Sequence, residues 1–134
     1  MDFIFECLAI GDLEDGQNEP PVEVILNLSE FAYQTTRIYK HLYFPDFEYL
    51  KDLRVIGECT QFIREHIQHR ERVLVHCFAG ISRSTTICMA YLYECGMSFQ
   101  EALALIQQKR PIASPHKTLL RSLSDWYDIS RERF

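Results

Sequence analysis

The 134-residue sequence has no long apolar run, no excess of basic residues and no internal repeat. Its hydrophobic stretches fall short of the roughly 20 residues that cross a bilayer, and no basic segment typical of a signal peptide precedes them. The net charge of −5 argues against a general binder of nucleic-acid backbones. We therefore expect no membrane partner and no nucleic-acid partner, and a cytoplasmic protein that also has access to the nucleus.

A disulfide framework is a further absence that the sequence predicts. The chain has five cysteines, an odd number, and no secretion signal, which favours reduced thiols. Cys7, Cys59, Cys88 and Cys95 are expected to be small residues of the core. Cys77 differs from them, because it alone is followed six residues later by an arginine, Arg83.

No linker divides the chain, so we predict one domain over residues 1–134. Residues 11–21 combine turn formers with acidic residues and are predicted to form a surface loop. Short runs rich in β-branched and aromatic residues predict strands. These runs are residues 3–10, 22–28, 38–44 and 73–76, the last being a continuous apolar stretch typical of a buried parallel strand.

The second half of the chain carries helical patterns. Apolar residues spaced three and four apart predict a helix across residues 53–67, and residues 83–95 form another that ends at Gly96. Ser98 and Glu101 make a capping box for a helix over about 99–109. Ser114 and Pro115 are expected to be the N-cap and first residue of the last helix. The order predicts an α/β fold: a central, mostly parallel twisted sheet of four to five strands flanked by helices.

Cys77 follows the predicted central strand, at the end where open α/β sheets bind their ligands. Gly80 can accept a left-handed backbone, so the loop can turn tightly before a helix begins near Arg83. Such a strand–loop–helix directs several N–H groups toward one point and makes an anion site. These groups favour a thiolate on Cys77 and also bind a tetrahedral phosphate, which the Arg83 guanidinium can clasp. A nucleophile below a bound phosphorus atom predicts phosphoryl transfer through a phosphocysteine.

Residues 75–84, VHCFAGISRS, resemble the His-Cys-x5-Arg-Ser/Thr signature of the cysteine-dependent protein tyrosine phosphatases. The AGISRS form is similar to the dual-specificity branch, in its small, atypical type that consists of the catalytic domain. Residues 90–111, LAIGD at 8–12 and VILNLS at 24–29 extend the resemblance over nearly the whole chain. The resemblance implies a phosphatase-type phosphate-binding loop that is built from six residues: Phe78, Ala79, Gly80, Ile81, Ser82 and Arg83.

Tyrosine, serine and threonine oxygens are poor leaving groups, so the reaction needs a general acid. The candidate is Asp46, which follows a strand and lies beside Pro45, where the resembling family has its aspartic acid. The same carboxylate would activate water to hydrolyse the phosphocysteine. The alternatives are that Asp46 only caps a turn and that Asp52 or Glu48, or no acid at all, serves instead.

Three further residues receive expected roles from the resemblance. Ser84 corresponds to a hydroxyl that donates to the cysteine sulfur, with N-capping as its alternative. His76 is implied to brace the loop by hydrogen bonds, or is simply a satisfied core histidine. Ser82 is expected to hold the shape of the loop. At His116 the sequence departs from the family, which has an asparagine that would tie neighbouring loops together.

The variable loop positions carry no Lys or Arg, which favours a phosphoprotein substrate, and the resemblance implies a shallow pocket for phosphotyrosine and phosphoserine or phosphothreonine. Two alternatives stay open: a phosphatase of an RNA end, lipid or sugar phosphate, and a phosphate-binding module with little turnover. A zinc site at His66, His69, His76 and Cys77 is disfavoured, because the sequence has no second cysteine pair. We expect no metal, no cofactor and a monomer.

Overall fold

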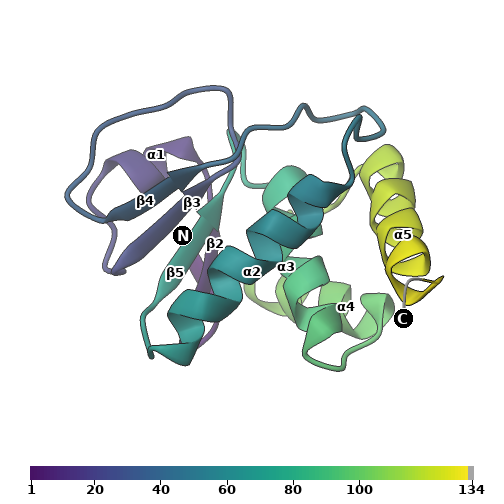
Figure 1. Ribbon diagram of the computed structural model, residues 1–134. Coiled ribbons are helices and arrows are strands. Elements are labelled where there is room, and N and C mark those ends of the chain that lie inside the picture. Colours follow the sequence, from purple (N-terminus) through teal and green to yellow (C-terminus); the bar gives the residue numbers. More distant parts are fainter. Residues whose placement is uncertain (133–134) are drawn as a thin grey trace.

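The computed structural model describes residues 1–132 and contains a five-stranded sheet with five helices (Figure 1). The elements in chain order are β1 (Asp2–Phe5), β2 (Leu8–Gly11), α1 (Leu13–Gln17), β3 (Val24–Asn27), β4 (Ile38–His41), α2 (Arg54–Gln68), β5 (Val73–His76), α3 (Arg83–Glu94), α4 (Phe99–Lys109) and α5 (Lys117–Glu132). The predicted α/β class is confirmed.

The strand order is β1-β2-β5-β3-β4, and only the pairing of β1 with β2 is antiparallel. β5 is central, and all four of its residues are buried. His76, its last residue, lies in register with Gly11 of β2 and Asn27 of β3. The parallel strands therefore end together, and the segment after β5 emerges in the middle of that edge.

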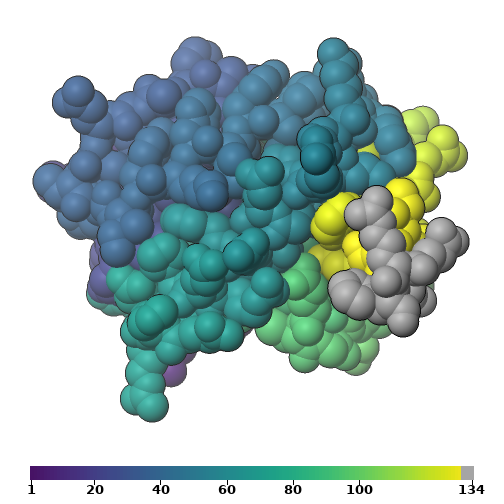
Figure 2. Space-filling model, viewed as in Figure 1, coloured from purple at the N-terminus to yellow at the C-terminus, as the bar shows by residue number. Residues whose placement is uncertain are grey.

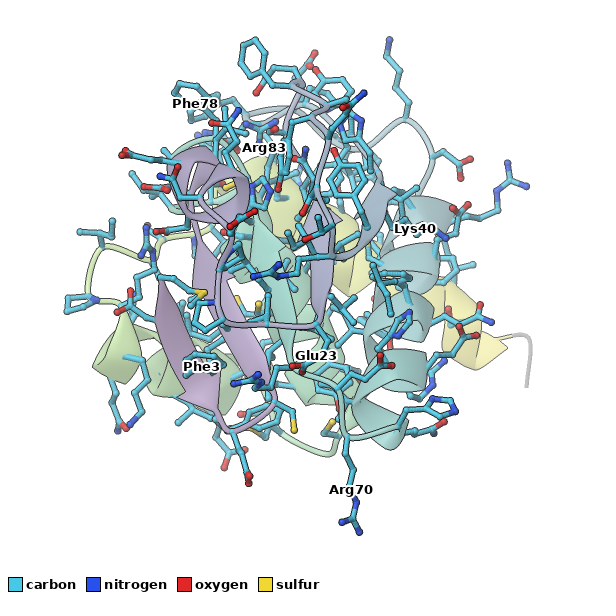
Figure 3. All side chains as sticks on the ribbon, turned by 90° about the vertical axis from the view of Figure 1, so that its left-hand side faces the viewer. Phe3, Glu23, Lys40, Arg70, Phe78 and Arg83 are labelled. Atoms are coloured by element: carbon cyan, nitrogen blue, oxygen red, sulfur yellow. The ribbon has the colours of Figure 1, made fainter. Side chains whose placement is uncertain are left out.

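Helices α2, α3 and α4 lie on one side of the sheet, with α5 packed against α2 and α3, and the short α1 lies on the other side (Figures 1 and 3). Side chains of β5 alternate between the two faces of the sheet: Val73 and Val75 belong to the large core, and Leu74 belongs to a smaller cluster on the α1 side. A strand that is apolar at every position is what burial on both faces requires. Burial on both faces therefore explains the apolar run at residues 73–76 of the sequence.

Three predicted boundaries are wrong. The single strand expected at residues 3–10 is two strands, β1 and β2, paired antiparallel with an irregularity between Phe3 and Phe5. The loop expected at 11–21 contains α1, whose capping box joins Asp12 to Asp15. The last helix begins at Lys117 rather than beside Ser114 and Pro115, because its first free N–H groups find acceptors on His116 instead.

The five cysteines all lie within the described residues, and none forms a disulfide. Cys59 and Cys88 are buried, and burial raises the pKa of both thiols. The expectation of four core cysteines is wrong for Cys95, which is exposed, and for Cys7, which is partly exposed. Among residues 1–132, no helix is both long and apolar enough to cross a membrane.

Candidate active site

Cys77 follows β5 directly and lies at the floor of a cleft of about 1010 Å³. The cleft opens at the carboxyl ends of the parallel strands. In Figure 3 Phe78 and Arg83 lie at this end of the molecule, whereas Glu23 and Arg70 lie toward the opposite end. The side chain of Cys77 is almost fully covered, with 2% of the residue exposed, so it is reached only through the cleft.

The loop from Cys77 to Arg83 folds back over the sulfur. Gly80 has a φ of 69°, in the left-handed region that favours glycine, and its N–H donates to Cys77 Sγ at 3.2 Å. The Ser84 hydroxyl, on the first turn of α3, lies 3.4 Å from the same sulfur. Ser84 is inside the helix rather than at its N-cap, which is Ser82, so the contact with sulfur is the role that the geometry favours.

Other segments hold this loop in place from behind. Arg110, at the end of α4, donates its Nε–H to Gly80 O at 2.8 Å, and Ser114 N donates to Ile81 O at 2.8 Å. A side chain at Gly80 would come within 2.5 Å of Arg110 Nη2 and 2.7 Å of the Gly11 carbonyl oxygen. The close packing and the left-handed backbone together require glycine at this position.

His76 is fully buried, and both of its ring nitrogens have partners. Nδ1 lies 3.0 Å from Cys77 O and Nε2 lies 2.7 Å from the Tyr33 hydroxyl. Burial lowers the pKa of His76 from its ordinary value. A neutral imidazole satisfies this arrangement, because Nδ1–H can donate to the carbonyl while Nε2 accepts from Tyr33. The ring therefore connects the backbone carbonyl of Cys77 to the Tyr33 hydroxyl.

Arg83 is 95% buried in the wall of the cleft, with 5% of the residue exposed. Nη1 donates to Phe44 O and Nη2 pairs with Glu30 Oε1, each at 3.2 Å. A hydrogen bond from the backbone N–H of Glu30 lowers the pKa of the Glu30 carboxyl, and the neighbouring Arg83 guanidinium also lowers it. Nε of Arg83 is buried and has no hydrogen-bond partner within residues 1–132. A buried guanidinium N–H in the lining of the cleft that also holds Cys77 is able to donate to an oxyanion.

Asp46 reaches the same cleft from the segment between β4 and α2. Its Oδ1 accepts from the Ser82 hydroxyl at 2.8 Å and from Phe47 N at 2.9 Å, so two donors fix the orientation of the carboxylate. Asp52 instead pairs with Arg54 at the surface, and Glu48 is exposed outside the cleft lining. Of the three carboxylates considered from the sequence, only Asp46 is brought to Cys77.

His116, where the resembling family has asparagine, contributes through its backbone. Its N–H donates to Ser82 Oγ at 2.9 Å, so the tie between loops is made without an amide side chain. Its ring Nδ1 lies 2.7 Å from Thr118 Oγ1 and accepts weakly from Thr118 N at 3.3 Å, which serves the start of α5.

The rim of the cleft is largely apolar. Phe31 and Phe78 are half exposed, and their ring centroids lie 5.9 Å apart. Besides Arg83, Lys117 is the one fixed cation of the lining, and the carboxylates of Glu30 and Asp46 offset the two. The full lining is Glu30, Phe31, Tyr43, Pro45, Asp46, Phe47, Cys77, Phe78, Ala79, Ile81, Ser82, Arg83, Ser114, Pro115, His116 and Lys117.

The histidines weighed as zinc ligands have other partners. His66 Nδ1 bonds Glu71 at 2.9 Å and His69 Nδ1 bonds the Glu65 carbonyl at 2.7 Å. Within residues 1–132, no group of three His, Cys, Asp or Glu side chains could hold a metal ion.

Three residues of the site were missed by reading the sequence. Glu30, Tyr33 and Arg110 come from loops 53, 43 and 30 positions away from their partners Arg83, His76 and Gly80. The sequence holds a weak signal for the first two, because Asn27 ends a strand as a buried polar residue. Its Nδ2 donates to Phe31 O at 2.7 Å and thereby shapes the loop that carries Glu30 and Tyr33.

Comparisons with known proteins agree with this geometry. Residues 12–129 match the family described as dual specificity phosphatase, catalytic domain. A probable dual specificity protein phosphatase of Dictyostelium discoideum is 38% identical over 102 residues, which are 74% of this chain and 26% of that protein. Dual specificity protein phosphatase 1 of Arabidopsis thaliana is 42% identical over 95 residues, 70% of this chain and 48% of that protein.

Among solved structures, human DUSP28 superposes with a TM-score of 0.85 at 17% identity and covers 100% of both chains, a likeness of fold. The chain spans about a quarter and about half of the length of the two curated relatives. The chain belongs to the family of dual specificity phosphatase catalytic domains, which confirms the resemblance stated from its sequence.

Proposed function

We propose that this chain is a protein phosphatase that hydrolyses phosphotyrosine and phosphoserine or phosphothreonine through a phosphocysteine on Cys77. The observation that carries the proposal is that Gly80 N donates to Cys77 Sγ while Arg83, whose Nε has no partner among the described residues, lines the same cleft. The Gly80 N–H would stabilise the thiolate, and the Arg83 guanidinium would bind phosphoryl oxygens and place phosphorus in line with the sulfur.

In the first step the Cys77 thiolate forms a bond to phosphorus while the bond from phosphorus to the substrate oxygen breaks. That oxygen takes the proton carried by Asp46. In the second step a water oxygen attacks the phosphocysteine, Asp46 takes one of its protons, and the sulfur leaves as a thiolate. The Ser84 hydroxyl, 3.4 Å from the sulfur, would donate to it as the charge develops.

The apolar rim supports a phosphoprotein as the substrate. A lipid headgroup or an RNA end with several phosphates would call for several cations, and the lining has Arg83 and Lys117 against Glu30 and Asp46. Phe31 and Phe78 instead offer aromatic surface to apolar side chains that flank a phosphorylated residue.

The test is release of phosphate from peptides that carry phosphotyrosine, phosphothreonine or phosphoserine, beside a phosphoinositide and a 5′-phosphorylated RNA at equal concentration. We expect kcat/KM to be highest on the peptides, with Cys77→Ser as the control for background. Higher kcat/KM on the lipid or the RNA would replace the protein substrate in this proposal. Binding of phosphopeptide without turnover by the natural chain would favour a binding module.

A further inference from the structure

The residue after Asp46 has an unusual backbone. Phe47 adopts a φ of 64°, a left-handed conformation that is unfavourable for a bulky residue. Its ring is not held by burial, because 67% of the residue is exposed. Such a conformation persists only where specific contacts determine it.

Two contacts of Phe47 are specific. Its backbone N–H donates to Asp46 Oδ1 at 2.9 Å, a bond that this local turn allows. Its ring stands edge-on to the His116 imidazole, with centroids 5.1 Å apart and an interplanar angle of 85°. Edge-to-face pairs of this kind are among the preferred arrangements of aromatic rings.

His116 is itself fixed at both its backbone and its ring. Its N–H donates to Ser82 Oγ at 2.9 Å, and its Nδ1 contacts Thr118 Oγ1 at 2.7 Å at the start of α5. The Ser82 hydroxyl in turn donates to Asp46 Oδ1 at 2.8 Å. The contacts therefore close a ring that runs from Asp46 through Ser82, His116 and Phe47 back to Asp46.

We infer that the aromatic pair of Phe47 and His116 positions Asp46 for proton transfer to the leaving oxygen. The inference rests on the proposed role of Asp46. The two side chains are positioning residues: they line the cleft beside Asp46 and act by fixing which way its carboxylate faces. Loss of the ring contact would let Phe47 relax out of its left-handed conformation and carry Asp46 away from the cleft.

The experiment compares two substrates that differ in their need for an acid. Para-nitrophenyl phosphate has a good leaving group, whereas a phosphoserine peptide requires protonation of its leaving oxygen. We expect Phe47→Ala to lower kcat on the peptide by about tenfold, a part of the roughly 10²–10⁴-fold that a general acid supplies, and to leave kcat on the aryl phosphate within about threefold.

Companion variants separate the ring contact from other effects of the substitution. Phe47→Gly removes the ring but accepts the left-handed backbone without strain, so it should lose less activity on the peptide than Phe47→Ala. Phe47→Tyr keeps the ring and should retain activity on the peptide. His116→Ala keeps the backbone donor and lacks the ring, and should resemble Phe47→Ala. Phe5→Ala is the matched control, because Phe5 is also partly exposed but lies at the opposite end of the sheet, where its partner Leu8 pairs with Val73.

The outcomes distinguish this inference from the proposed function. Once Asp46→Asn has removed the acid, adding Phe47→Ala should lower kcat on the peptide no further. If Asp46→Asn slows the peptide selectively and Phe47→Ala does not, the positioning role is wrong while the acid stands. A rise in KM for both substrates with kcat unchanged would make Phe47 a binding surface only. If Asp46→Asn shows no selectivity, the assignment of the acid itself fails.

Discussion

The two walls of the cleft are built in different ways. The loop from Cys77 to Arg83 continues the central strand and is held from behind by Arg110, Ser114 and His76. The segment that carries Asp46 is anchored by Phe44 and Leu50, which are buried, while Phe47, Glu48 and Tyr49 between them are exposed. The proposed nucleophile is thus part of the folded core, and the proposed acid is attached to it by a few contacts.

This difference predicts two kinds of effect for substitutions in the two walls. A change behind the phosphate loop should cost folding free energy and activity together, whatever the substrate. A change in the acid segment should cost rate on substrates with poor leaving groups and little stability. Figure 2 shows the segment before α2 packed at the surface against side chains of α5, where Leu50 N donates to Ser122 Oγ and the Tyr49 hydroxyl to Asp125.

The largest effect is expected from Cys77→Ser. The hydroxyl is a far weaker nucleophile, so turnover should fall by about 10⁴-fold or more on every substrate. Gly80 N and Arg83 remain, so binding of a phosphopeptide should be retained, as titration calorimetry would measure. Arg83→Ala is the matched comparison and should lose both turnover and binding. Residual turnover in Cys77→Ser near that of the natural chain would refute covalent catalysis.

Asp46→Asn probes the other wall. Turnover of a phosphoserine peptide should fall by roughly 10²–10⁴-fold, the usual contribution of a general acid. The melting temperature should hardly move, because the amide can still accept from Ser82 and Phe47. Kinetics on two leaving groups and a thermal melt check both parts. A large drop in melting temperature would contradict the contrast between the walls.

Arg110→Leu tests the support behind the phosphate loop. It leaves the buried Gly80 carbonyl without its donor and removes the ion pair with Asp2, so the free energy of unfolding should fall by about 1–3 kcal/mol. Activity should fall by a similar factor on good and poor leaving groups, in contrast to Asp46→Asn. Arg64→Leu, which removes a more exposed pair with Glu94, is the control and should change the stability much less.

The smallest effect concerns pH. Because burial lowers the pKa of His76 in the folded protein, the unfolded chain takes up a proton first as the pH falls. The contribution of His76 to the free energy of unfolding is therefore complete above about pH 6.5 and declines below it, by at most about 1.4 kcal/mol per pH unit. The slope of the free energy of unfolding against pH, obtained from denaturant melts, should differ between the natural chain and His76→Asn in this window. Equal slopes would show that His76 does not titrate differently on folding.

The sequence predicted one wall of the cleft better than the other for a physical reason. Cys77, Gly80, Arg83 and Ser84 lie within eight residues of each other, so local patterns define them. Asp46 was identified by the family resemblance. The left-handed φ of Phe47 could not be predicted, because it depends on a contact with the ring of His116.

Fold errors have a similar origin. No glycine, proline or asparagine marks the turn at Glu6 and Cys7 between β1 and β2, so the two strands read as one. The helix α1 packs closely against other segments at Gly16, where a side chain would collide with the Tyr33 hydroxyl and the His76 ring. Such contacts join positions that no short window of sequence contains.

The unpaired Nε of Arg83 has a consequence for any measurement on this protein. Arg83 Nε is a buried donor able to bind a tetrahedral oxyanion, and an oxyanion that binds the folded but not the unfolded chain raises the free energy of unfolding by RT ln(1 + [L]/Kd). A melting temperature recorded in phosphate or sulfate buffer would describe a complex. The choice of buffer thus becomes part of the thermodynamic state.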